Sequence, residues 1–205
     1  MTFVLFTAGE FGDAVGEHLR PRVPSLHVTP IWAAPDLEDL VAAADFVATA
    51  LWRRYPAELD RLDEACHRRQ VRWTSAVLEE TQLRTGPLIR PGHGPCHACY
   101  RTRWMTHTPA PDRQDTLDTA YATHPLIGVP GFTPGTVAMA AAALLMDRDE
   151  PDAAPGRLRV IDLLQCTIEQ SQVVPVHGCA RCGPAHEPGE RYHRWLGAAL
   201  REGPP

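Results

Sequence analysis

The sequence of 205 residues contains no lysine, so all 20 of its basic residues are arginine. A biased base composition in the genome would produce this absence, but it also has a chemical consequence. Without lysine the chain has no side-chain amine that could form a Schiff base or act as a compact cation on a phosphate. Chemistry that depends on a lysine is therefore excluded.

Long apolar runs are absent as well. A helix that crosses a bilayer needs about 20 mostly apolar residues, and the Ala-rich run at 137–146 is too short. The first six residues, MTFVLF, lack the basic leader and the cleavage site of a signal peptide. We therefore expect a soluble, cytoplasmic protein that keeps its thiols reduced and does not bind a membrane.

An excess of positive charge is also missing. The net charge is −5, and the arginines are scattered along the chain. Proteins that bind nucleic acid usually gather basic residues on one face or along one element. We therefore expect no nucleic-acid partner.

Four of the six cysteines form two short hooks, CHAC with Cys96 and Cys99, and CARC with Cys179 and Cys182. Each hook can place two thiolates on one tight turn, and two hooks supply the four soft ligands of a tetrahedral structural zinc. Because the hooks are far apart in sequence, a shared zinc would tie the end of the chain to its middle.

Two other interpretations of these cysteines stay open, namely disulfides and four unrelated buried thiols. The other two cysteines, Cys66 and Cys166, have no patterned base beside them and are interpreted as ordinary thiols. His97 and His177 flank the hooks, either as hydrogen-bonding neighbours of a metal site or as solvated side chains.

The first 80 residues alternate between strand-like and helix-like patterns. Short apolar, β-prone runs predict strands, and apolar residues at helical spacing predict the helices between them. Strands are expected at 3–6, 26–32, 45–51 and 70–77, and helices at 14–20, from 36, and at 56–69. This rhythm is typical of right-handed βαβ units and a parallel sheet.

The turn after the first expected strand reads TAGEFG and carries Gly9 and Gly12. These are two of the three glycines of a nucleotide-binding fingerprint, with Thr7 in place of the first. A tight strand-to-helix turn without a ligand is the alternative. The expected second strand also lacks the acidic residue that would bind a ribose hydroxyl.

After residue 80 the rhythm changes. Residues 101–124 are polar and contain prolines, which predicts a long mobile loop or an interaction segment. An Ala-rich helix is expected to end at Met146, and residues 158–164 and 167–176 are interpreted as a hairpin that leads to the second hook. We expect one α/β domain over 1–184 and a tail over 185–205 with a short amphipathic helix.

Several segments resemble the ThiF/MoeB superfamily of ubiquitin-activating-like adenylyltransferases. The resemblance rests on residues 94–100 (GPCHACY), 127–146, 156–162 (GRLRVID) and 177–184 (HGCARCGP), about half of the chain. It implies a Rossmann-like α/β fold, with a parallel βαβ half, an antiparallel extension and a four-cysteine zinc clip. It also implies ATP binding over the glycine turn, adenylation of a peptide or small-protein carboxylate, and a homodimer.

This sequence departs from the pattern of that superfamily where the chemistry takes place. The aspartate that holds Mg²⁺ after the third strand would fall near Leu51 and Trp52, which cannot ligate a hard cation. No lysine is present for the phosphates, and no cysteine lies between Cys99 and Cys166 to form a thioester. These losses remove most of the electrostatic stabilisation of phosphoryl chemistry. We therefore expect a pseudoenzyme with no catalytic residues and without ATP as a cofactor.

Within the superfamily, the chain resembles the ThiF-like partners of YcaO cyclodehydratases, which act in the biosynthesis of bacteriocins and other ribosomally made, azole- or azoline-containing peptides. This implies a non-catalytic subunit that binds a precursor peptide, a YcaO-type enzyme, or both. The alternative is a divergent adenylyltransferase that acts on a peptide or carrier-protein carboxylate. In that branch a winged-helix segment ahead of this domain typically reads the leader, and we expect no such segment before the first expected strand. We expect another subunit or residues 101–124 to read the leader.

Contact energy at an interface concentrates in aromatic and arginine side chains. Tyr100, Arg103 and Trp104 bring such side chains together directly after the first hook and are the expected partner-binding residues. The alternative is that Trp104 packs on the zinc hook as part of the core.

Overall fold

The computed structural model describes residues 2–32, 36–124 and 127–183. The tail helix expected beyond residue 185 lies outside these residues. Within them, none of the helices has both the length and the apolar character needed to cross a membrane.

Thirteen helices and strands follow one another in the described residues. The strands are β1 (Phe3–Ala8), β2 (Leu26–Pro30), β3 (Phe46–Leu51), β4 (Arg72–Glu79), β5 (Gln82–Thr85), β6 (Arg157–Asp162) and β7 (Thr167–Gln172). The helices are α1 (Gly9–Leu19), α2 (Leu37–Ala42), α3 (Pro56–Arg69), α4 (His97–His107), α5 (Pro111–Thr123) and α6 (Pro134–Asp149).

All seven strands form one sheet in the order β2-β1-β3-β4-β5-β6-β7. The pairs among β2, β1, β3 and β4 are parallel, and those from β4 to β7 are antiparallel. In the parallel half, Leu5 lies between Val28 of β2 and Ala48 of β3. The predicted fold class is confirmed, because a parallel, Rossmann-type α/β half is followed by an antiparallel extension.

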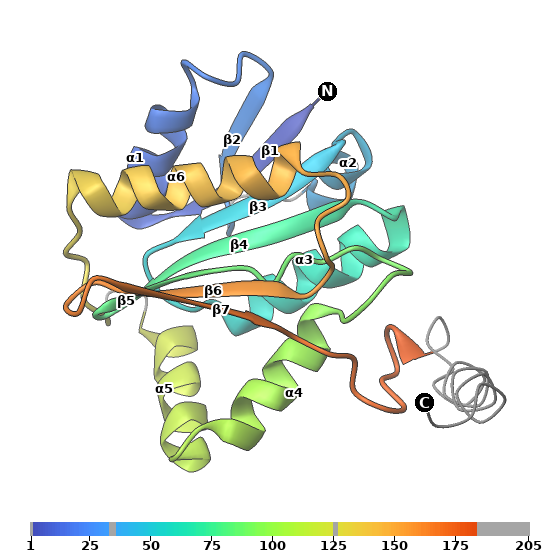
Figure 1. Cartoon of the computed structure of the whole chain (residues 1–205), viewed down its shortest axis with the longest axis vertical. Helices are drawn as coiled ribbons and strands as arrows, with labels where there is room; N and C mark the ends of the chain where they lie inside the picture. The colour runs from blue at the N-terminus through green and yellow to red at the C-terminus, as the bar shows by residue number, and fades with distance from the viewer. Residues whose placement is uncertain (1, 33–35, 125–126, 184–205) are drawn as a thin grey trace, which may run out of the picture.

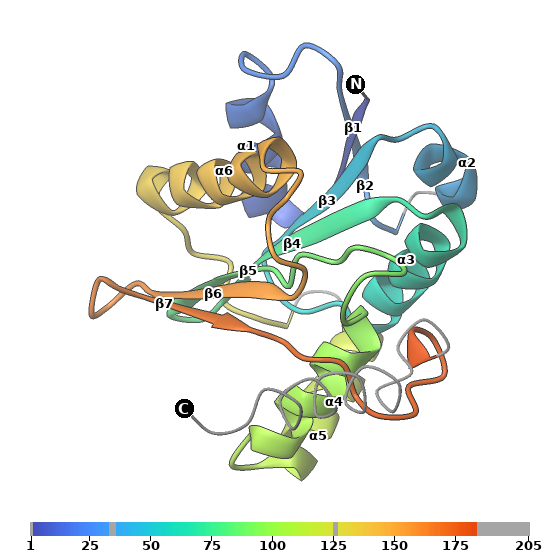
Figure 2. The ribbon, with the colours of Figure 1, turned by 45° about the vertical axis from the view of Figure 1, so that its right-hand side comes forward.

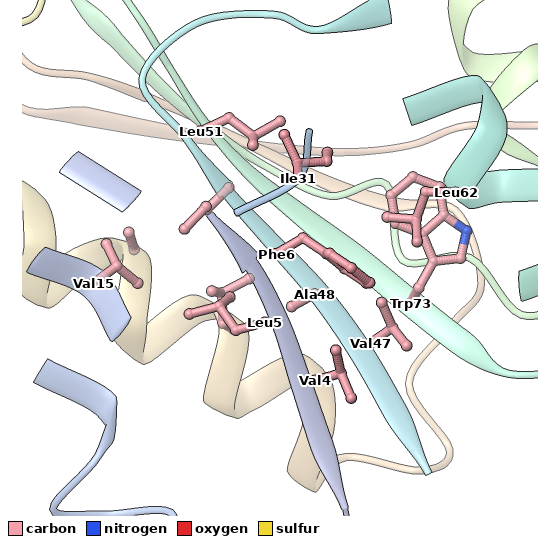
Figure 3. Packing of buried hydrophobic residues seen from close by; sticks show 14 of the residues in the cluster. Val4, Leu5, Phe6, Val15, Ile31, Val47, Ala48, Leu51, Leu62 and Trp73 are labelled. Atoms are coloured by element: carbon pink, nitrogen blue, oxygen red, sulfur yellow. The ribbon is translucent and has the colours of Figure 1, made fainter. Parts of the chain in front are cut away.

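Helices cover both faces of the parallel half of the sheet (Figures 1 and 2). α1 and α6 pack on one face, and α2 and α3 lie on the other. Every residue of β1 and β3 is buried, as expected for strands covered on both sides. Leu5 points toward Val15 of α1, whereas Phe6 points toward the side of Leu62 and Trp73 (Figure 3).

The prediction of a loop over residues 101–124 was wrong, because this segment forms most of α4 and all of α5. The two helices lie beyond α3, away from the layer of α1 and α6 (Figure 1). α5 has no fully buried residue, so its sequence carries little of the apolar periodicity by which a helix is recognised. Pro111 lies in the first turn of α5. A proline is favourable there, because its missing N–H group would have no partner within the helix.

Two smaller expectations about strands also needed correction. β5 was not expected, and it forms the antiparallel neighbour of β4 that begins the second half of the sheet. The hairpin of β6 and β7 is confirmed, but β6 ends at Asp162 rather than at Leu164, and β7 ends at Gln172 rather than at Val176. There the Asp162 carboxylate accepts hydrogen bonds from the backbone N–H groups of Leu164 and Gln165, which turns the chain.

Candidate metal centre and the cleft at the strand ends

The two cysteine hooks converge on one point. Cys96 directly precedes α4 and Cys99 lies in its first turn, while Cys179 and Cys182 come from the segment after β7. All four sulfur atoms lie within 4.8 Å of one another. The predicted convergence of the hooks is therefore confirmed.

The spacing of the sulfur atoms fits a metal better than disulfides. The Sγ separations are 3.8 Å for Cys96–Cys99, 3.6 Å for Cys96–Cys179 and 3.3 Å for Cys99–Cys182. A tetrahedral zinc with Zn–S bonds of about 2.3 Å would hold its sulfur ligands about 3.8 Å apart, whereas a disulfide needs about 2.05 Å. The four cysteines could hold a metal ion such as zinc.

The pKa values of three of the four thiols are shifted, and not all in the same direction. The Cys96 thiol donates a hydrogen bond to the sulfur of Cys99 and lowers the pKa of Cys99 to about 4, with help from the Val176 N–H. The pKa of Cys96 is raised by the same contact, and burial raises the pKa of Cys182 to about 12. A divalent cation would remove this imbalance, because it favours the thiolate at all four positions.

Asp63 of α3 is fully buried and lies next to the cysteine cluster. Its carboxylate accepts hydrogen bonds from the Trp73 indole N–H (3.1 Å), the His97 backbone N–H (3.2 Å) and the Arg181 guanidinium (2.5 Å). It therefore ties one residue of each hook to α3 and β4. Sequence reasoning missed this residue, although an aspartate next to Leu62 on the apolar stripe of α3 is the signal that could have found it.

The two histidines beside the hooks have different surroundings. His97 is 5% exposed, and its ring lies 5.6 Å from that of Trp73 and 5.7 Å from that of Tyr100. Its Nδ1 is 3.7 Å from Asp60, whose pKa is lowered by this histidine. His177 is exposed. His97 therefore belongs to the packing around the cluster.

The three expected partner-binding residues differ in their surroundings. Tyr100 is buried beneath the guanidinium of Arg84, and burial raises its pKa. Arg103 donates hydrogen bonds to the carbonyl oxygens of Val174 (2.6 Å) and Pro175 (2.8 Å), so it fastens the chain that leads to the second hook. Of the three, Trp104 is half-buried and lines an open groove.

That groove has a volume of about 730 Å³ and runs between α5 and the turn that joins β4 to β5. Trp104, Leu117 and Tyr121 form part of its walls. Arg54 stacks on the Trp104 ring at 4.6 Å and pairs with Asp118 of α5 at 3.3 Å. The groove therefore offers both aromatic surface and charge.

A second site lies at the carboxyl ends of β1 and β3, where the order of the parallel strands reverses. Ligands of open α/β sheets bind in the crevice at such a point. Here the indole of Trp52 fills the position beside the glycine turn. A Cβ added to Gly9 would lie 2.5 Å from its ring, and one added to Gly128 would lie 2.6 Å from the opposite end. Trp52 is therefore packed between two glycine backbones, and we call it the tryptophan plug.

Arg53 extends this plug. Its guanidinium stacks on the rings of Tyr55 (4.5 Å), Tyr121 (4.5 Å) and Trp52 (5.4 Å), and it donates a hydrogen bond to the Tyr121 carbonyl oxygen. Arg53 is only 3% exposed. The cation at this end of the sheet thus holds α5 against β3.

The other residues of the glycine turn have structural partners. A Cβ on Gly12 would lie 2.4 Å from the Ala50 carbonyl oxygen, so the glycine lets α1 pack closely on β3. The Thr7 hydroxyl donates a hydrogen bond to Asp13 at 3.0 Å. Leu51, at the end of β3, is fully buried. Gly12, Thr7 and Leu51 thus have structural roles in the packing of α1 and β3.

No protein-family model matches the sequence, and no curated protein sequence matches it either. Similarity to solved structures is clear at the level of the fold. The heterocyclase TruD superposes with a TM-score of 0.62 at 16% sequence identity, over 89% of this chain and 27% of TruD.

Two Escherichia coli structures superpose equally well. The microcin synthetase complex McbBCD gives a TM-score of 0.61 at 12% identity, over 88% of this chain and 68% of the other. MccB with MccA gives a TM-score of 0.60 at 14% identity, over 89% of this chain and 66% of the matched chain. The chain thus spans about a quarter of TruD and about two thirds of the matched chain in each of the other two structures, and what it shares with all three is the fold.

Proposed function

We propose that this protein is a ThiF-like partner subunit, without adenylating activity of its own, in the biosynthesis of a ribosomally made and modified peptide. It would bind the precursor peptide, a YcaO-type cyclodehydratase, or both. The fold supports this proposal, because the similar structures include a heterocyclase and a microcin synthetase. The metal centre would hold zinc and would be structural, since all four of its protein ligands are cysteines.

The observation that carries the proposal is the tryptophan plug. Anions bind at a helix N-terminus because backbone N–H groups there point at the ligand. At the start of α1, the indole of Trp52 packs on Gly9 instead. The neighbouring residue Leu51 is buried and cannot ligate Mg²⁺. The position of Trp52 beside Gly9 and the absence of a metal ligand at Leu51 both support a subunit without adenylating activity.

A subunit without its own chemistry acts through contact. The groove between α5 and the β4–β5 turn suits a peptide or a partner helix, because Trp104, Leu117 and Tyr121 supply aromatic and apolar surface there. Ile127 and Val129 at its margin are 42% and 55% exposed. We assign partner binding to this groove.

Two assays test the proposal. Pyrophosphate exchange with Mg²⁺ and ATP should show no activity above background with any peptide, and calorimetry should show no ATP binding. An active adenylating enzyme serves as the control. Magnesium-dependent exchange would instead establish a divergent adenylyltransferase.

Co-purification tests the groove. Trp104→Ala combined with Leu117→Ala should lower the yield of the YcaO-type partner at least about tenfold, because truncating aromatic and apolar anchors removes most of the contact energy. Met146→Ala is the matched control, since Met146 is 47% exposed on α6, outside the groove. A folded double variant that retains its partner would refute this assignment.

A further inference from the structure

A cavity of about 490 Å³ opens directly beside the tryptophan plug. It lies where α1 begins and where β2 and β3 end, and its volume is within the range of small-molecule sites. Its lining residues come from four separate segments of the chain. They are Gly9, Glu10, Phe11, Trp32, Tyr55, Pro130 and the plug residue Trp52.

The walls of this cavity are mainly aromatic. The rings of Trp32 and Tyr55 lie 6.0 Å apart at an angle of 41°, so they are tilted rather than stacked. Phe11 is held from behind by an edge-to-face contact with Phe132 at 5.7 Å. Trp32 is 59% exposed, although a tryptophan normally buries most of its large apolar surface.

The two polar side chains of the aromatic wall, Trp52 and Tyr55, pair with each other. The Trp52 indole N–H donates a hydrogen bond to the Tyr55 hydroxyl oxygen at 2.8 Å. Glu10 is the only charged side chain among the described residues that line the cavity, and it is exposed to solvent. None of the described residues that line the cavity has a cationic side chain, and a phosphate or carboxylate there would face the Glu10 carboxylate at the edge.

A cationic ligand is also poorly matched. Aromatic rings attract cations through their faces, but the guanidinium of Arg53 already stacks on Trp52 and Tyr55. Arg53 does not line the cavity, so it approaches these rings from outside. A second cation within the cavity would be repelled by this charge.

We propose that the cavity binds a neutral planar ring, either an aromatic side chain or a five-membered azole. Aromatic rings pack against one another in offset or edge-to-face arrangements, and the tilted rings of Trp32 and Tyr55 offer both. That a peptide carries the ring rests on the proposed function, whereas binding of the ring itself does not.

Saturation-transfer NMR on the zinc-loaded protein tests this proposal with four probes. N-acetyltryptophanamide and 2-methylthiazole-4-carboxamide represent the two kinds of neutral ring, N-acetylargininamide represents a cation, and Mg²⁺ with ATP represents the nucleotide. We expect saturation transfer to at least one neutral ring and weaker or no transfer to the cation and to ATP. The stronger of the two ring signals identifies the source of the ring.

Trp32→Ala should raise the dissociation constant of the bound ring probe at least about tenfold. Because Trp32 is largely exposed, this variant should fold, which its thermal unfolding would check. Leu164→Ala is the matched control, since Leu164 is 76% exposed at the distant β6–β7 turn, and it should leave probe binding unchanged.

Three results would overturn the proposal. The first is absence of transfer to both neutral rings, and the second is unchanged ring binding in Trp32→Ala. The third is preferential binding of the cation or of ATP. If ATP binds and displaces the ring probes, the cavity is a nucleotide site and the proposed function fails as well. If neither ATP nor the rings bind, only the cavity assignment fails.

Discussion

Removal of the tryptophan plug gives the most direct test of the cleft. In Trp52→Ala, the protein loses an aromatic side chain that is 9% exposed and packed between two glycine backbones. Truncation of a buried tryptophan costs about 3–5 kcal/mol. The hydrogen bond to Tyr55 and the stacking of Arg53 disappear with the ring.

For a chain of this length, each kcal/mol shifts the melting temperature by about 2–4 °C. The expected loss for Trp52→Ala is therefore about 6–20 °C, measured by circular dichroism with zinc present. Trp32→Ala is the matched control, because Trp32 is 59% exposed and its removal should cost only a few degrees. A melting temperature of Trp52→Ala within about 2 °C of the wild type would refute the plug. Pyrophosphate exchange should stay absent in this variant, because no metal carboxylate is restored.

Four further predictions concern the metal centre, the Asp63 carboxylate beside it and the buried thiol of Cys66. Cys96→Ser should release the metal, as measured by elemental analysis, and should increase hydrogen exchange in the segment after β7. Wild-type protein that contains no zinc after purification without chelator would contradict this prediction. Asp63→Asn should lower the free energy of unfolding in urea by about 3–5 kcal/mol, because it leaves the partly buried guanidinium of Arg181 without its counter-charge. Asp60→Asn is the control, since the Asp60 carboxylate is more exposed, and it should cost about 1 kcal/mol or less. Equal losses in the two variants would argue against the role of Asp63 in supporting the cysteine cluster. Burial raises the pKa of Cys66 above its ordinary value of 9.0, so at pH 8 iodoacetamide should label the exposed Cys166 and leave Cys66 a neutral, unreactive thiol. Labelling of both cysteines at one rate would show that Cys66 is accessible. In the unfolded protein the Cys66 thiol ionises near its ordinary pKa of 9.0, whereas the buried thiol stays neutral to higher pH. The free energy of unfolding should therefore fall as the pH rises above about 9.

The parallel half of the sheet was predictable because its signals are local. β1 and β3 are continuous apolar runs, and α3 begins at Pro56 and ends at Arg69, as its apolar stripe indicates. Such periodicities depend on residues a few positions apart. The prediction failed at β5, α4 and α5. A four-residue strand leaves little pattern to recognise, α4 buries residues only near its start, and α5 buries none.

The partner-binding residues show a different limit. Tyr100, Arg103 and Trp104 have the residue types of an interface, but residue type does not decide exposure. Arg84 covers Tyr100, and the carbonyl oxygens of Val174 and Pro175 accept hydrogen bonds from Arg103. These contacts come from segments that are distant in sequence, so composition alone could not reveal them.

By itself the sequence determined which chemistry is available to this protein. The absence of lysine, the pair Leu51 and Trp52 at the end of β3, and the four cysteines in two hooks are fixed by residue type and spacing. Only the tertiary structure decided how these groups are used. It places Asp63 against Arg181, 118 positions away, and it closes Trp52 between Gly9 and Gly128. Both arrangements depend on which distant segments meet when the helices pack on the sheet, and such long-range contacts leave no local pattern in the chain.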